Sequence, residues 1–245
     1  MDKIDITMTA TLRPEIITRT LDSILNCVIG RKTDRFRLIL NIDRIGDKVK
    51  PKEIIRPAAE RFKDLIFNIA DSPSFPKAVK WVWSQATARF IFHIEDDWIF
   101  SRKIEVDDMI RILDKYEEVS SLRLSKYNTR PSEVIKQFEC KWRYNEDGFY
   151  IADRWEKQFG LNPILIKKQF IDEALPRMVD HVNPEKQFRM SQEYMVPVIK
   201  KWKYGLYTTP GAKALVTDIG RDWSKPRGFL KPKSRTFLTW VKNDK

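Results

Sequence analysis

The chain has 245 residues, 42% of them apolar and 33% charged, which is typical of a globular protein and argues against a disordered, collagen-like or coiled-coil chain. Lys and Arg number 46 against 34 Asp and Glu, and the net charge of +12 favours an anionic partner: nucleic acid, a nucleotide phosphate or an acidic surface. Two cysteines, two histidines and no membrane-length apolar stretch argue against a disulfide framework, a His-rich zinc site and a membrane span. The first residues lack a signal-peptide pattern, so we expect a cytoplasmic protein.

Apolar runs and helical patterns alternate over the first hundred residues. Strands are predicted at 4–9, 37–43, 65–70 and 89–94, and helices open at 13–15 and cover 52–62 and about 74–86. This alternation predicts an α/β fold whose mostly parallel central sheet is flanked by helices. Ligands of such sheets bind at the carboxyl ends of the strands. The glycine-rich loops of dinucleotide-binding proteins and P-loop enzymes are absent.

The second half of the chain has weaker periodicity. We predict a helix at 106–116, a strand at 121–124, a loop-rich insertion at 127–150, a strand at 160–166, a helix at 191–202 and a strand at 214–217. No internal repeat and no Gly/Ser linker is present, so we predict one domain over residues 1–245.

Three adjacent carboxylates, Glu95, Asp96 and Asp97, follow the fourth predicted strand. Like charges at this spacing repel one another unless a cation neutralises them. A hard divalent ion does so, and Mg²⁺ or Mn²⁺ typically binds one or two carboxylates together with substrate phosphates. The alternative is a solvated turn whose acids cap the next helix. The position at the end of a buried strand favours the metal site.

Several motifs, taken in order, resemble glycosyltransferases of the GT-A fold, and family-2-like enzymes in particular. Residues 9–14 (TATLRP) and 21–24 (LDSI) look like the first strand and helix of that family, and residues 75–81 (FPKAVKW) stand where it has the helix before the metal-binding strand. Residues 90–97 (FIFHIEDD) are similar to that strand, with a Glu-Asp-Asp variant of its DXD motif. The resemblance covers residues 4–100 well and the remainder thinly.

The resemblance implies a nucleotide-diphosphate sugar as donor and Mn²⁺ or Mg²⁺ as cofactor. Asp97 matches the acid that binds the metal, Glu95 the acid that faces the donor's ribose and sugar, and Asp43 the acid on the nucleobase or ribose. For Arg13 and Lys77 the alternative is an ordinary surface side chain at the start of a helix. The donor-binding residues that we expect are Thr9, Arg13, Asp43, Lys77, Glu95, Asp96, Arg221 and Lys225.

Asp218 follows the last predicted strand, where many GT-A enzymes have a metal-binding His, so we expect it to be a second metal ligand. The segment 219–245 has eight Lys or Arg against two Asp, a net charge of +6. It resembles the basic mobile tails that close over the diphosphate in this family; the alternative is a solvated basic terminus. Its basic residues include Arg221, Lys225, Arg227, Lys231 and Lys233.

On the acceptor side, residues 191–195 (SQEYM) resemble the family's acidic acceptor motif, with Glu193 at the position of the catalytic base. A first-turn Glu favoured by the helix dipole is the alternative, and Glu185 and Asp180 are further candidates for the same role. Aromatic faces can stack on sugar rings, and Trp98, next to the metal motif, is the best placed of the eight tryptophans.

The leading hypothesis is a metal-dependent, inverting glycosyltransferase that moves a sugar from a nucleotide-diphosphate sugar to the hydroxyl of a glycan or similar acceptor. Residues 1–100 would bind the nucleotide sugar, 101–218 the acceptor, and 219–245 would form a basic tail. The charge also permits hydroxymethylated DNA bases as acceptors. Two competing hypotheses are a sugar nucleotidyltransferase, which normally has a Gly-rich loop, and a non-enzymatic nucleic-acid-binding protein.

Overall fold

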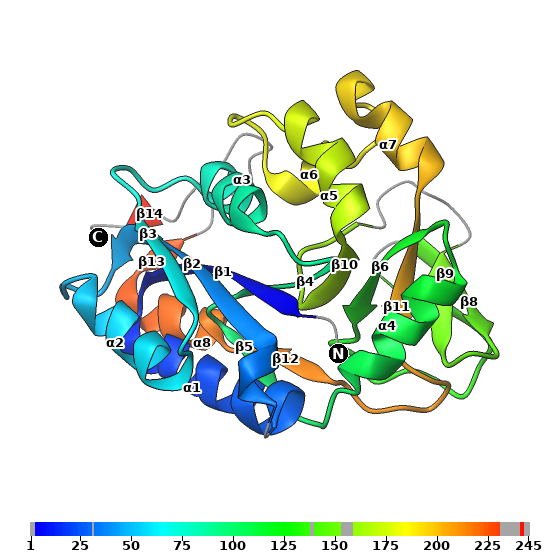
Figure 1. Cartoon of the computed structure of the whole chain (residues 1–245), viewed down its shortest axis with the longest axis horizontal. Helices are drawn as coiled ribbons and strands as arrows, with labels where there is room; N and C mark the ends of the chain where they lie inside the picture. Colours follow the sequence, from blue (N-terminus) through cyan, green and yellow to red (C-terminus); the bar gives the residue numbers. More distant parts are fainter. Residues whose placement is uncertain (1–2, 31, 138–139, 153–158, 231–240, 243–245) are drawn as a thin grey trace.

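A computed structural model describes residues 3–30, 32–137, 140–152, 159–230 and 241–242 (Figure 1). A twisted ten-stranded sheet runs through the molecule, with helices on both of its faces. Within the described residues no helix is long and apolar enough to cross a membrane.

The first half of the chain forms the parallel part of the sheet, in the order β3-β2-β1-β4. Its strands are β1 (Ile4–Leu12), β2 (Phe36–Gly46), β3 (Leu65–Ile69) and β4 (Phe90–Glu95). The connecting helices are α1 (Pro14–Ile24), α2 (Lys52–Arg61) and α3 (Phe75–Gln85). Every strand and helix predicted for this half is confirmed, because buried apolar runs separated by amphipathic helices are compatible with few other arrangements.

In the second half, β10 (Ile164–Lys167) lies antiparallel between β4 and β6 (Val119–Leu124), and β11 (Lys203–Tyr207) is parallel to β6. An antiparallel ribbon then completes the sheet, formed by β9 (Phe149–Ala152), β8 (Cys140–Asn145) and β7 (Val134–Gln137). The predicted loop-rich insertion at 127–150 is therefore wrong. In β8, Cys140 and Trp142 are buried while Lys141 and Arg143 are exposed, and this short alternation is masked by the polar residues around it.

The remaining elements are short. They are α4 (Val106–Lys115), α5 (Lys168–Ala174), α6 (Pro184–Gln187), α7 (Val196–Lys201), α8 (Gly220–Ser224), and the pairs β5 (Trp98–Phe100) with β12 (Val216–Asp218) and β13 (Phe229–Leu230) with β14 (Val241–Lys242). A π turn covers Leu25–Ile29, and 3-10 turns cover Thr33–Arg35, Leu175–Arg177, Glu193–Met195 and Lys225–Arg227. The helix predicted at 191–202 is thus a 3-10 turn followed by α7, and the strand predicted at 160–166 begins only at Ile164.

Two apolar clusters cover the two faces of the sheet. One contains α1, α2 and α4 with side chains such as Ile6 and Leu38, and the other contains α3, α5 and α7 with side chains such as Ile39 and Ile91. Figure 1 shows α3, α5, α6 and α7 above the sheet and α1 and α2 below it. Because helices cover both faces of the sheet, polar side chains gather at its amino and carboxyl edges, where the strands begin and end.

Asp5 fixes the amino edge of the parallel strands. Its carboxylate accepts hydrogen bonds from Arg37 Nε (2.9 Å) and Nη2 (2.8 Å) and from the backbone N–H groups of Thr87 (2.6 Å) and Ala88 (2.8 Å). A buried carboxylate with this many donors has its charge fully compensated and plays a structural part.

Candidate functional site

The strand order creates a switch point at the carboxyl end of β1. The chain passes from β1 outward to β2 and β3, and then returns to the other side of β1 to form β4. Thr11 is the register partner of Asp43 in β2, and Thr9 that of Glu95 in β4. Ligands of open α/β sheets bind at such a position. The fold therefore brings together sequence-predicted residues from three strands.

Asp96 lies buried at this edge, 1% exposed, and is bound by Arg13, the residue before α1. Arg13 Nη2 pairs with Asp96 Oδ1, Arg13 Nε donates to Oδ2 at 3.3 Å, and the backbone N–H of Thr11 donates to the same oxygen at 3.0 Å. The Asp96 main chain is fixed as well, because its N–H donates to Thr9 O (3.0 Å) and its carbonyl accepts from Thr20 Oγ1 (2.6 Å).

Arg13 also reaches the next carboxylate, since its Nη2 lies 3.2 Å from Asp97 Oδ2. Burial disfavours the guanidinium charge, but the two neighbouring carboxylates outweigh this and raise the pKa of Arg13. One cation therefore faces two buried carboxylates, and one negative charge is left uncompensated by this contact. The expectation that Arg13 binds the donor stays a prediction, whereas the alternative of a surface side chain is wrong.

The Asp97 carboxylate packs against the start of α8. The N–H of Ile219 donates to Asp97 O (2.9 Å), and a side chain at position 220 would collide with Asp97 Oδ2, so only glycine fits there. The carboxylate of Asp218, register partner of Trp98, accepts from Gly220 N at 2.9 Å. Asp97 and Asp218, the two predicted metal ligands, thus flank the same glycine.

Trp223 connects this cluster to the following segment. Its ring centre lies 5.3 Å from the Arg13 guanidinium and 4.9 Å from that of Arg227, and it stacks on Phe229 at 5.2 Å. Arg227 Nε also donates to Asp47 Oδ1 (3.2 Å). Residues 220–229 are therefore docked through specific contacts in this structure, and the closure of a mobile basic tail over the diphosphate stays a prediction. Lys231 and Lys233 lie outside the described residues.

Asp43, at the end of β2, is buried on the other side of β1. Its carboxylate accepts from Ser74 N (3.0 Å) and from Asn41 Nδ2 (3.0 Å), and Asn41 in turn accepts from Asn68 Nδ2 (2.7 Å). Burial raises the pKa of Asp43 to about 6, helped by the nearby Asp96 charge and opposed by these two hydrogen bonds. Ser74 Oγ, itself buried, has no hydrogen-bond partner among the described residues.

The other predicted donor-side residues surround this centre without closing on it. Lys77 at the start of α3, and Arg221 and Lys225 after β12, are exposed. Trp98 is only 4% exposed and packs in the core, so the expectation that it stacks on the acceptor does not fit its position; Lys126 Nζ lies 5.7 Å from the centre of its ring.

The three candidate bases lie apart from the cluster or are engaged elsewhere. Glu193 is exposed in the 3-10 turn before α7, which Figure 1 shows at the upper right, whereas α8 beside Asp97 is on the left. Asp180 pairs with Lys80 at 2.6 Å. Glu185 accepts from Leu161 N (2.8 Å) and lies near the buried Arg123.

Sequence reasoning missed Gly220, Ser74 and Trp223, which shape the site without belonging to a motif. The sequence offered one signal for Gly220, a glycine shortly after the acidic residue that ends β12. Glycine at such a place often indicates the close approach of another group.

No protein-family model matches the sequence, and a search of curated proteins finds no similar sequence. Solved structures do match. A fragment of S. aureus TarS, residues 1–349, aligns with a TM-score of 0.57 at 12% identity over 87% of this chain and 59% of that one. The mannosyltransferase PcManGT from Pyrobaculum calidifontis, in complex with GDP-Man and Mn²⁺, aligns with a TM-score of 0.57 at 10% identity over 85% of this chain and 55% of that one.

The chain has the GT-A fold. The predicted α/β architecture is thereby confirmed, with the antiparallel ribbon β7–β9 as an addition. The chain spans between about 55% and 60% of the length of PcManGT and the TarS 1–349 fragment.

The Arg13 pairing leads to a stability prediction. Arg13→Met leaves Asp96 and Asp97 buried without their cation and should lower the free energy of unfolding by about 3–5 kcal/mol, measured by urea denaturation. Arg13→Met/Asp96→Asn should recover much of this loss, because the cluster then carries the same net charge as in the wild type. Arg111→Met, which breaks exposed ion pairs with Asp108 and Asp147, should lower the free energy of unfolding far less. Equal losses for the two single variants would contradict this account.

The raised pKa of Asp43 predicts a pH dependence. Between the unfolded pKa near 3.8 and the folded pKa of about 6, the folded protein keeps a proton that the unfolded chain has lost. The resulting stabilisation is complete below about pH 4 and is lost as the pH rises through 6. From pH 4 to 7.5, the free energy of unfolding of Asp43→Asn should therefore rise by roughly 2–3 kcal/mol relative to the wild type. Parallel denaturation curves for the two proteins at all pH values would argue against it.

Proposed function

We propose that this protein is a metal-dependent glycosyltransferase that moves a sugar from a nucleotide-diphosphate sugar to an acceptor hydroxyl. One observation carries the proposal: at the switch point of a GT-A fold, Asp96 and Asp97 share one cation among the described residues, Arg13, while Asp218 lies on the other side of Gly220 with Arg221 Nε 3.9 Å from its Oδ2. Unlike Asp5 at the opposite edge, this cluster has an excess of negative charge, as a site for a divalent cation requires.

The donor set fits Mn²⁺ or Mg²⁺ bound together with substrate. The described residues contain no group of three His, Cys, Asp or Glu placed around one point, so no complete protein cage is present there. Both ions are commonly bound through one or two carboxylates plus phosphate oxygens. Asp97 and Asp218 would hold the ion, and when bound it would neutralise the charge that develops on the leaving diphosphate.

The nucleotide would bind at the buried polar residues near the end of β2. The Asp43 carboxylate and the Ser74 hydroxyl, which has no partner among the described residues, offer an acceptor and a donor for a nucleobase or ribose. Lys77, Arg221 and Lys225 would supply positive charge around the diphosphate, and Glu95 would face the sugar. The structures of TarS with UDP and UDP-GlcNAc and of PcManGT with GDP-Man support a nucleotide-sugar donor.

A glycan or similar hydroxyl compound is the proposed acceptor, and inversion the proposed outcome. Inversion needs a carboxylate that takes the acceptor proton. Glu185 is poorly suited, because its Oε1 already accepts a hydrogen bond from Leu161 N (2.8 Å) and lies near the buried Arg123. Glu193 remains the proposed base, and this role requires the acceptor side of the molecule to close toward the donor side.

The proposal is tested by metal-dependent donor binding. The wild type should bind at least one of a panel of UDP- and GDP-sugars in the presence of Mn²⁺, measured by isothermal titration calorimetry. Asp97→Asn should weaken that binding by at least about ten-fold, because a metal ligand is lost while Arg13 keeps its pairing with Asp96.

Asp222→Asn is the matched control. It makes the same charge change on an exposed residue of α8, the helix that packs against Asp97, and it should bind the donor as the wild type does. The proposal fails if the wild type binds none of these donors with metal, or if the two variants behave alike.

A further inference from the structure

A hollow of about 930 Å³ lies beyond the acidic cluster, lined by residues between Tyr127 and Lys136. These residues follow β6, which points the same way as β4 because both are antiparallel to β10. The hollow therefore opens from the same edge of the sheet as the proposed donor site. Lys126 joins the two, since its Nζ lies 5.7 Å from the Trp98 ring centre and 5.5 Å from that of Tyr127, and Trp98 directly follows Asp97.

The loop that forms this hollow is fixed from two sides. Thr129 N–H donates to Ala212 O (2.8 Å), Thr129 Oγ1 donates to Thr209 O (2.6 Å), and Gly211 N–H donates to Arg130 O (3.1 Å). From β9, Tyr150 OH donates to Ser132 O at 2.5 Å. A loop held in this way loses little conformational freedom when a ligand binds.

The side chains of the loop offer one aromatic face and an excess of positive charge. Tyr127 is 51% exposed, one of very few large apolar side chains that are exposed in the described residues. Arg130 and Lys136 are also exposed, and neither forms an ion pair with any residue that the structure describes. Elsewhere exposed cations do pair, as Lys115 does with Asp147 at 2.7 Å. Residues 125–136 contain three basic residues and a single acid, Glu133.

We propose that this hollow is the acceptor subsite and that the acceptor is a saccharide carrying phosphate or carboxylate groups. The inference rests on the proposed function and specifies its acceptor. Tyr127 would stack on a sugar ring, and Arg130 and Lys136 would bind the anionic groups. The charge is confined to one hollow with one aromatic side chain, which fits a short charged saccharide better than single-stranded nucleic acid, whose successive bases need several stacking platforms.

The experiment compares the full chain with charged and neutral saccharides of equal length by calorimetry in 0.15 M salt. The carboxylate pair is hexagalacturonate and its methyl ester, and the phosphate pair is maltohexaose with and without 6-phosphate groups. At least one charged probe should bind about ten-fold or more tightly than its neutral counterpart. Arg130→Gln/Lys136→Gln should lose about ten-fold of that affinity, and Tyr127→Ala should weaken binding where Tyr127→Phe retains it.

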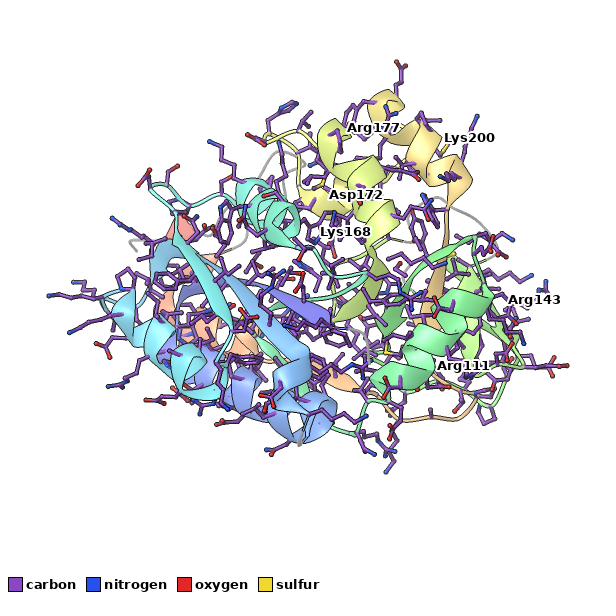
Figure 2. All side chains as sticks on the ribbon, viewed as in Figure 1. Arg111, Arg143, Lys168, Asp172, Arg177 and Lys200 are labelled. Carbon is purple, nitrogen blue, oxygen red and sulfur yellow. The ribbon has the colours of Figure 1, made fainter. Side chains whose placement is uncertain are left out.

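Arg177→Gln/Lys200→Gln is the matched control. This variant removes the same charge from two exposed residues. Figure 2 labels both at the top of the molecule, away from the β-ribbon, which is marked by Arg143 at the right. Binding of the charged saccharide should be unchanged. Equal affinity for charged and neutral probes, equal losses in the two double variants, or tighter binding of an oligothymidylate would each overturn the inference.

Mn²⁺-dependent binding of a nucleotide sugar to the same proteins separates the two proposals. Donor binding should be the same in Arg130→Gln/Lys136→Gln as in the wild type. Intact donor binding without a preference for charged saccharides would overturn this inference alone, whereas a wild type that binds no donor would overturn the proposed function.

Discussion

The contact of Arg13 with Asp96 and Asp97 is the interaction on which the site depends. A guanidinium can satisfy one carboxylate with two hydrogen bonds, and here it extends to a second at 3.2 Å. Both acids can therefore be buried at the end of β4 while some negative charge remains. The Trp223 ring against Arg13, and Gly220 against Asp97, connect the last described helix to the same pair. Three distant parts of the chain thus meet at one ion-pair group.

The amino and carboxyl ends of the parallel strands differ in how far the charges of their buried acids are compensated. At the amino edge Asp5 has four donors, two of them from its own arginine, Arg37, so nothing remains for a ligand to neutralise. At the carboxyl edge the acids outnumber the cation, and Asp43 is buried deeply enough for its pKa to approach 6. Keeping such groups costs folding stability. Their presence beside the switch point fits the proposed binding of a ligand better than a stabilising role.

The parallel half could be predicted from the sequence because each strand is a short buried run between amphipathic helices. The ribbon β7–β9 could not, since its one buried face is made by residues such as Trp142 among exposed polar neighbours. The acids Glu95, Asp96 and Asp97 were found from the sequence, by their adjacency after a buried strand and by a family resemblance, and their role at a metal stays a prediction. The partner of Asp96 was not, because it is 83 residues away, and the same holds for Gly220 and Trp223, whose roles arise only when the chain is folded. Trp98 was misjudged because proximity in sequence to a site does not make a ring accessible.

The positions of the basic and acidic residues indicate where the net charge of +12 acts. Asp96, Asp97 and Asp218 would repel a diphosphate brought to this edge, so the exposed Arg221, Lys225 and Lys77 nearby do not by themselves make a phosphate site. A divalent ion reverses the sign of the centre and lets the surrounding cations act together with it on the phosphates. Arg130 and Lys136, which have no ion-pair partner in the described part of the chain, lie on the other side of Lys126 and Trp98, where they can bind a different anion. Under the two proposals the charge excess would serve two ligands, and a divalent ion would make the first of them acceptable to an acidic centre.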